Sequence, residues 1–521
     1  MIIIDNTRVP ETHDDVEAVN SAGRRQSLYE ARRKIFPKRV TGNFRTFKWV
    51  VMAITLAIYY LTPWIKWDRG PYAPDQAVLL DLANQRFYFF AIEIWPHEFY
   101  YVAGLLVMAG VGLFLITSTV GRAWCGYACP QTVWVDLFIG VERLIEGDRN
   151  ARIKLDNAPW SPEKLAKRVS KHAIWLVIGA ATGGAWVFYF GDAPTLFVDI
   201  FTLRAPAVAY FTIAILTATT YTLGGMMREQ VCTYMCPWPR IQGAMLDEHS
   251  LTVTYNDWRG EPRGKVAKKA GANRKPIGDC IDCKACVAVC PMGIDIREGQ
   301  QLECITCALC IDACDAVMDK IGRERGLISY ATLNDYSANM AMAQSETGAI
   351  DPTRIRDAAG KFVAGLSHTN WRSIIHPRTL VYFMAWAAIG VAMLVALSLR
   401  PSLGLNVLHD RNPLYTMLSD GTIQNGFDVK VLNMTTHPQD LVLTVEGLEG
   451  ATLAGTGLDQ ENAESLRVSV EPDRVLPLRV YVRSTDPNLP EQSDFNMIIT
   501  SSDGALSATT GVRFEAPETK K

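Results

Sequence analysis

Two short stretches decide the fold of the central part of this chain: CIDCKACVAVCP at residues 280–291 and CITCALCIDAC at residues 304–314. Each has the spacing C-x2-C-x2-C-x3-C, with which bacterial ferredoxins bind iron–sulfur clusters. Three cysteines of one stretch bind one cluster, and the fourth reaches the neighbouring cluster. Structural zinc is the alternative, but zinc sites use C-x2-C pairs separated by longer loops. The spacing therefore predicts two [4Fe–4S] clusters, one on Cys280, Cys283, Cys286 and Cys314, the other on Cys290, Cys304, Cys307 and Cys310.

The composition of the whole chain favours a membrane protein and gives no support to nucleic-acid binding. The 521 residues carry a formal net charge of −2, so the overall charge does not favour a polyanionic partner. Hydrophobic residues make up 49% of the chain, and they gather in blocks long enough to cross a bilayer. All 12 cysteines lie between residues 125 and 314, which favours a reducing compartment for that segment. The polar start of the chain predicts no signal peptide.

Five segments are long and apolar enough to be membrane helices. Tryptophans flank the first segment at Trp49, Trp64 and Trp67, as aromatic residues do at membrane interfaces. The sequence therefore predicts five membrane crossings, at about 47–66, 99–119, 172–190, 205–225 and 379–399.

The charge of the connecting loops predicts the orientation of these helices. Residues 120–171 contain nine lysines and arginines, whereas residues 67–98 contain two and residues 191–204 contain one. Because basic loops stay on the inner side of the membrane, the N terminus and the loops 120–171 and 226–378 are expected in the cytoplasm. The odd number of crossings then leaves the C terminus in the periplasm, and the protein in the inner membrane of a bacterium.

The part of the chain after Arg400 has a different pattern. Short runs rich in Val, Leu, Ile and Thr alternate with turn residues and contain no cysteine, which is typical of an antiparallel β-sandwich of immunoglobulin-like type. The sequence thus predicts a multi-domain integral membrane protein with five parts: a basic cytoplasmic tail (1–46), four membrane helices (47–225), a cytoplasmic two-cluster ferredoxin-like domain (226–378), a fifth membrane helix (379–399) and a periplasmic immunoglobulin-like β-sandwich (400–521).

The other four cysteines form two C-x3-C-P motifs, each placed after a predicted membrane helix. Residues 122–130 read RAWCGYACP and residues 229–238 read EQVCTYMCPW. In a helix the i, i+4 spacing puts both sulfurs on one face, and the proline suits the first turn of a following helix. Soft thiolates select Cu(I), zinc or clusters, so the motifs are candidate metal or redox sites, with a dithiol relay as the alternative. The cysteines concerned are Cys125, Cys129, Cys232 and Cys236, and the spacing leaves open whether they share one site.

A polar and aromatic motif, WPHEFYY at residues 95–101, precedes the second predicted membrane helix on its outer side. His97 and Glu98 in this motif could bind a cation or accept a proton from a quinol. An interfacial turn with aromatic anchors is the alternative, and the sequence does not decide between them.

The two C-x3-C-P motifs, the cluster-binding stretch and the β-sandwich together resemble the CcoG/FixG/RdxA family, accessory proteins for assembly of cbb-type cytochrome c oxidase. The resemblance extends from the motif at 95–101 to the end of the chain. It implies a membrane-bound iron–sulfur protein that reduces Cu(II) to Cu(I) for the oxidase, directly or through copper chaperones. It further implies that Cys125, Cys129, Cys232 and Cys236 handle copper.

Two other functions stay open at this point. One is a quinol dehydrogenase subunit that passes electrons to a redox partner, although no C-x-x-C-H haem motif is present to carry them outward. The other is an oxidase-assembly scaffold in which the clusters only sense redox state. The electron donor, a cytoplasmic protein or a membrane quinol, is not specified by the sequence.

Overall fold

The computed structural model describes residues 34–264, 277–345, 348–351, 353–357, 361–363, 365–367, 369, 374–435, 437–457, 462–486 and 489–517. Most of the predicted basic tail, 1–46, lies outside these residues. Within them, five helices are long and apolar enough to cross a membrane, which confirms the prediction of five spans. They are Asn43–Trp64, Pro96–Val120, Pro162–Phe190, Ala207–Met227 and Pro377–Ser398.

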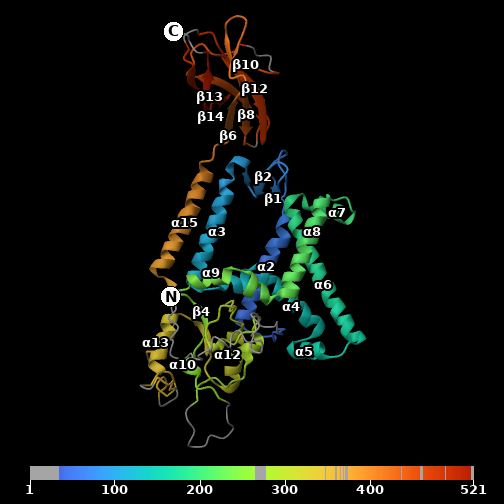
Figure 1. Ribbon diagram of the computed structural model, residues 1–521, viewed down its shortest axis with the longest axis vertical. Helices are drawn as coiled ribbons and strands as arrows, with labels where there is room; N and C mark the ends of the chain where they lie inside the picture. Colours follow the sequence, from blue (N-terminus) through green and yellow to red (C-terminus); the bar gives the residue numbers. More distant parts are fainter. Residues whose placement is uncertain are drawn as a thin grey trace, which may run out of the picture.

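Close helix packing divides the membrane helices into two groups (Figure 1). In the first group, α3 (Tyr100–Val120) lies beside α15 (Pro377–Ser398), and Gly104 leaves room for the side chain of Met393. In the second group, α6 (Pro162–Val187) packs on α8 (Ala207–Thr219), with α2 (Asn43–Leu61) against α6. A Cβ atom at Gly183 would lie 2.9 Å from the backbone oxygen of Ile213, so only glycine permits this approach.

The C-terminal part is a sandwich of two antiparallel sheets, as predicted. Burial alternates along β8 (Ile423–Asn433), where Phe427, Val429 and Val431 point into the core. One sheet has the order β10-β12-β8-β6, with β7 paired to β8, and the other has the order β11-β9-β13-β14. The remaining strands are β6 (Leu403–His409), β7 (Thr416–Met417), β9 (Gln439–Glu446), β10 (Thr452–Gly455), β11 (Ser465–Val470), β12 (Arg474–Ser484), β13 (Gln492–Ser501) and β14 (Ser507–Glu515).

A small three-stranded sheet lies at the same end of the membrane helices as the sandwich (Figure 1). Its strands are β1 (Val78–Asp81), β2 (Arg86–Phe89) and β3 (Ile92–Ile94). Arg86 of β2 donates a hydrogen bond to Glu93 Oε1 at 3.0 Å and forms an ion pair with Asp473 of the sandwich at 2.8 Å. This ion pair joins the small sheet to the sandwich.

The cysteine-rich part lies at the opposite end of the membrane helices from the sandwich (Figure 1). It contains a two-stranded antiparallel sheet of β4 (Thr252–Tyr255) and β5 (Ile328–Ala331), and the helices α10 (Asp257–Gly260), α11 (Ala285–Val289), α12 (Leu309–Ile321) and α13 (Leu333–Ala343). Helices α4 (Pro130–Glu146) and α9 (Trp238–Met245) lie between this part and the membrane helices, and α5 (Arg149–Asn157) lies beside this part, at the level of α12 (Figure 1).

Candidate functional site

The two cysteine loops share an unusual backbone conformation. In the first loop Asp282 and Lys284 have positive φ angles of 52° and 56°. In the second loop the corresponding residues, Thr306 and Ala308, have φ angles of 56° and 59°. Alternating left-handed residues turn successive backbone N–H groups toward one concavity, and such concavities bind anionic groups, including iron–sulfur clusters. The matched geometry therefore fits a cluster in each loop.

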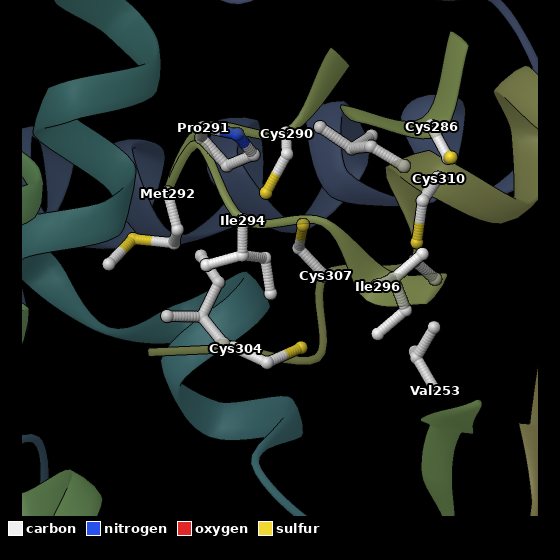
Figure 2. Close-up of a pocket in the computed structure, with 13 residues that line it drawn as sticks. Val253, Cys286, Cys290, Pro291, Met292, Ile294, Ile296, Cys304, Cys307 and Cys310 are labelled. Carbon is white, nitrogen blue, oxygen red and sulfur yellow. The ribbon is translucent and has the colours of Figure 1, made fainter. Parts of the chain in front are cut away.

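Five of the predicted cluster ligands line one apolar pocket. The thiols of Cys290, Cys304, Cys307 and Cys310 share this pocket with Cys286, beside Met292, Ile294 and Ile296. Figure 2 shows the sulfurs of Cys290 and Cys307 pointing toward each other. Burial raises the pKa of Cys290 to about 12 and that of Cys304 to about 11, so without iron these groups are neutral thiols. Iron would deprotonate them on binding.

The thiols predicted for the other cluster are less uniformly enclosed. Cys280, Cys286 and Cys314 pack in one buried core beside Tyr255 and Met318, whereas Cys283 is exposed. Among the described residues, no three potential ligand side chains are already drawn together at coordinating positions. Each set thus has four thiols, the donor type that iron–sulfur clusters use, and cluster binding would draw the four thiols of a set together.

The two C-x3-C-P motifs have the same backbone structure. Each forms one π-helical turn, η4 (Trp124–Ala128) and η7 (Val231–Met235), closed by a hydrogen bond from Cys129 N to Trp124 O at 2.9 Å and from Cys236 N to Val231 O at 2.8 Å. The expected helical turn is thus a π turn, a feature common at functional sites. Helix α4 begins at Pro130 and α9 begins at Trp238, so a helix follows each motif, as its proline indicates.

A positive φ angle precedes both π turns. Gly121 has a φ of 61°, and Arg228, at the equivalent position four residues before the first cysteine, has a φ of 45°. This conformation is costly for arginine, and Arg228 compensates by donating to Gly225 O and pairing with Glu142. The internal repeat seen in the sequence is therefore also a repeat of backbone conformation.

The structure brings the two motifs together. Cys125 lies close enough to Cys129, Cys232 and Cys236 for their charges to act on its pKa. Burial has a larger effect than these charges, and burial and the charges together raise the pKa of Cys125 to about 12. Burial likewise raises the pKa of Cys232 to about 11. The Cys125 thiol donates to Gln242 Oε1 at 3.1 Å, so α9 of the second motif positions the first cysteine of the first motif.

The first motif also touches the second cysteine loop directly. A Cβ atom at Gly126 would lie 2.7 Å from Ile305 O and 3.0 Å from Cys307 Cα, so the two backbones are in closest contact here. The Tyr127 hydroxyl donates to Cys307 O at 3.2 Å. Cys125 itself packs with Ile305 and Cys307 in one buried cluster. The thiol pair and the cluster loop thus meet with no intervening segment.

Arg122 ties three segments together at this contact. Its guanidinium donates to Cys304 O at 3.1 Å and, through short contacts, to Leu302 O and Pro239 O. The side chain is buried, and its positive charge lies close to the thiol of Cys125 and to Cys304 of the second cysteine loop. Sequence reasoning did not single out Arg122, because its partners are backbone carbonyls that lie far along the chain.

Met292 is a second residue that the sequence did not indicate. It lines the pocket of Figure 2 and also a neighbouring cavity that contains Cys232, so it separates the cluster thiols from the second motif. The thioethers of Met226 and Met235, which neighbour the second motif in sequence, are about half exposed. The methionine between the two sites thus comes from the cluster loop.

Residues of the motif at 95–101 connect the start of α3 to the end of α15. Glu98 is buried, accepts a hydrogen bond from Trp95 N at 3.1 Å, and pairs with Arg400 at 2.7 Å. Arg86 stacks 3.9 Å above the Trp95 ring. These contacts hold the start of α3 against the end of α15, and they favour the reading of the motif as an interfacial turn.

Comparisons with known proteins agree with this geometry. Residues 227–333 match a family model described as a 4Fe-4S dicluster domain, and residues 102–146 match a 4Fe-4S binding domain. Residues 393–517 match the IG-like fold at the C-terminal of FixG, which is classed there as an oxidoreductase. These matches define a membrane-bound iron–sulfur protein with an immunoglobulin-like domain.

Whole-chain relatives narrow this class. The nitrogen fixation protein FixG of Rhizobium meliloti is 66% identical over 469 residues, which cover 90% of each chain. Protein RdxB of Cereibacter sphaeroides is 55% identical over 88% of this chain and 90% of its own. Protein RdxA of the same organism is 51% identical over 89% and 92%. The chain belongs to the FixG/RdxA/RdxB family.

Proposed function

We propose that this protein reduces Cu(II) to Cu(I) with electrons from its two [4Fe–4S] clusters, and that the Cu(I) serves the copper centre of a cbb-type cytochrome c oxidase or its copper chaperones. The observation that supports this most directly is the contact of Gly126 and Cys125 with Ile305 and Cys307. In this contact the first thiol motif lies against the second cysteine loop, which carries Cys304, Cys307 and Cys310 of the ligands proposed for one cluster.

The chain's own residues suit each part of this task. Cys290, Cys304, Cys307 and Cys310 would bind one cluster, and Cys280, Cys283, Cys286 and Cys314 the other. Bound clusters supply one-electron carriers, which match the single electron that converts Cu(II) to Cu(I). Cys125, Cys129, Cys232 and Cys236 would bind the copper substrate, since soft thiolates favour Cu(I) over Cu(II).

The orientation belongs to the same proposal. The basic residues of 120–171 and the confinement of all 12 cysteines to residues 125–314 support a cytoplasmic position for the clusters and the thiol pairs. The β-sandwich would then lie in the periplasm, where it could dock a partner. No electron would need to cross the bilayer.

One finding favours a second candidate function. The 4Fe-4S binding domain model covers residues 102–146, a range that includes Cys125 and Cys129. The four thiols of the two motifs could therefore hold a further cluster, and the protein would then pass electrons from a quinol or a cytoplasmic donor to a redox partner.

A copper-reduction assay separates these functions. The protein is purified anaerobically, its clusters are reduced, excess reductant is removed, and Cu(II) is added with a chromophore specific for Cu(I). Each reduced cluster should yield one Cu(I). The double variant Cys232→Ser/Cys236→Ser should yield little Cu(I) with unchanged cluster absorbance, whereas Tyr234→Phe, an exposed change in the same turn, should act as wild type. Loss of cluster absorbance in the double variant would instead support a further cluster.

A further inference from the structure

A small cavity lies between the end of the first cysteine loop and the second thiol motif. Its volume is about 30 Å³, enough for one small ion, since one water needs roughly 10–15 Å³. Two sulfur-bearing side chains line it, Cys232 of η7 and Met292, which follows the cluster ligand Cys290 by two residues. The rest of the lining comes from α2, from α4, from the segment between η6 (Thr220–Met227) and η7, and from the two cysteine loops.

Met292 presents its backbone and its side chain to different sites. Its backbone N–H donates to the sulfur of Cys290, a proposed cluster ligand. Figure 2 shows the thioether of Met292 pointing away from the sulfurs of Cys290 and Cys307. The side chain also packs against the buried group that contains Cys125. The thioether is therefore directed away from the cluster ligands and toward the region of the two thiol motifs.

The sulfur side chains of this cavity are partly exposed, whereas its carboxylates are already engaged. Cys232 and Met292 are both of intermediate burial, so neither is sealed off by protein atoms. Asp136 pairs with Arg45 at 2.9 Å, and its second oxygen is enclosed by the protein. Glu229 has a partner of its own. A ligand in the cavity therefore meets sulfur rather than carboxylate oxygen.

This donor set favours one kind of ion. Thiolates and thioethers are soft ligands that select Cu(I). Zinc sites use cysteine, histidine and carboxylate ligands, so a thioether does not favour zinc. One thiolate, one thioether and Cu(I) together carry no net charge, and a neutral group is the least costly to hold in a partly buried place.

We infer that the thioether of Met292 is a Cu(I) ligand, with the Cys232 thiolate as its partner across the cavity. This inference rests on the proposal that the two thiol motifs bind copper, and it adds a sulfur from outside both motifs. Because a thioether favours Cu(I) over Cu(II), Met292 stabilises the product of the proposed reduction. The loop that binds a cluster thus also contributes to the copper site.

Copper K-edge X-ray absorption of selenomethionine-labelled protein tests this inference. The full chain with intact clusters is loaded with one Cu(I) per chain, and the fine structure is fitted for selenium neighbours of copper. Cu–Se scattering is expected in the wild type and in Met235→Leu, and it should be lost in Met292→Leu. Both changes remove one thioether and nearly conserve volume. Met235 is the matched control, because it lies in η7 beside Cys236 but is 55% exposed and outside the cavity lining.

The affinity for Cu(I), measured by competition with a Cu(I)-specific chelator, is the second readout. It should fall at least tenfold in Met292→Leu and keep the wild-type value in Met235→Leu, with cluster absorbance unchanged in both. Wild type that binds Cu(I) without Cu–Se scattering, or equal affinities of the two variants, would overturn the inference and leave the proposed copper reduction standing. Cu–Se scattering in a wild type whose reduced clusters fail to reduce Cu(II) would support the inference and overturn the proposed function alone.

Discussion

Gly126→Ala adds one methyl group where the first thiol motif meets the second cysteine loop. The added Cβ would lie 2.7 Å from Ile305 O, 3.0 Å from Cys307 Cα and 3.1 Å from Cys307 N. All three atoms belong to the backbone, so no side-chain rotation can relieve the contact. An ordinary contact begins at 3.4 Å, so the two backbones must separate by about 0.7 Å.

The size of the effect follows from this overlap. Overpacking by one methyl group in a close-packed region costs about 1–3 kcal/mol. If that cost falls on the contact between the motif and the loop, the closely packed arrangement becomes about 5- to 150-fold less populated. Electron transfer from the clusters to copper should slow by a factor in this range, while each cluster keeps its ligands and its absorbance.

The assay is the rate of Cu(I) formation by protein with pre-reduced clusters. Gly140→Ala is the matched control, because it is the same substitution in the neighbouring helix α4 and its Cβ would meet nothing within 4 Å. Both changes alter helix propensity and unfolded-state entropy alike. Equal rates for Gly126→Ala and Gly140→Ala would refute the idea that electrons pass through this contact.

Three other predictions concern separate features of the molecule. Cys232→Ser should weaken copper binding at least tenfold by equilibrium dialysis without loss of cluster absorbance, and loss of absorbance would contradict a copper role. Arg122→Gln removes a buried cation near the second loop, so the potential of one cluster should fall by roughly 40–90 mV in an EPR-monitored titration, the equivalent of about 1–2 kcal/mol, and unchanged potentials would contradict this. Burial, together with a hydrogen bond that the protonated Glu93 donates to Asp473, raises the pKa of Glu93 to about 8, so the folded state keeps a proton that the unfolded state releases near pH 4.5. The contribution of protonated Glu93 to the free energy of unfolding is complete below about pH 4.5 and is lost as the pH rises to about 8. Thermal unfolding measured across this range should show the loss, and Glu93→Gln should make the unfolding temperature less dependent on pH.

Much of the fold could be predicted because its signals are local. Membrane helices follow from unbroken apolar runs, and α15 has no buried residue in its most apolar window, as expected for a helix that faces lipid. The sandwich follows from alternation, as along β8, where every second residue is buried. The cluster loops follow from spacing, since four ligands must lie within reach of each cluster.

The arrangement of the site could not be predicted, because it depends on contacts between distant segments. Cys125 and Cys232 come together because the segments that follow α3 and η6, each with a π-helical turn, pack against each other, with Gln131 donating to Leu223 O and Arg228 O. No residue near Gly126 in the sequence indicates that the backbone of Ile305 lies against it. Glu98 had the chemistry of a cation ligand, but Arg400, at the end of a helix far along the chain, engages it.

The most direct test of the central proposal is to follow both partners of the electron transfer in one anaerobic stopped-flow experiment. Protein with reduced clusters is mixed with Cu(II), and cluster absorbance and Cu(I)–chromophore absorbance are recorded together. The proposal predicts that the clusters reoxidise at the rate at which Cu(I) forms, one Cu(I) for each electron, and that Cys232→Ser/Cys236→Ser abolishes both changes. Clusters that stay reduced in the wild type, or Cu(I) that forms equally fast in the double variant, would contradict it.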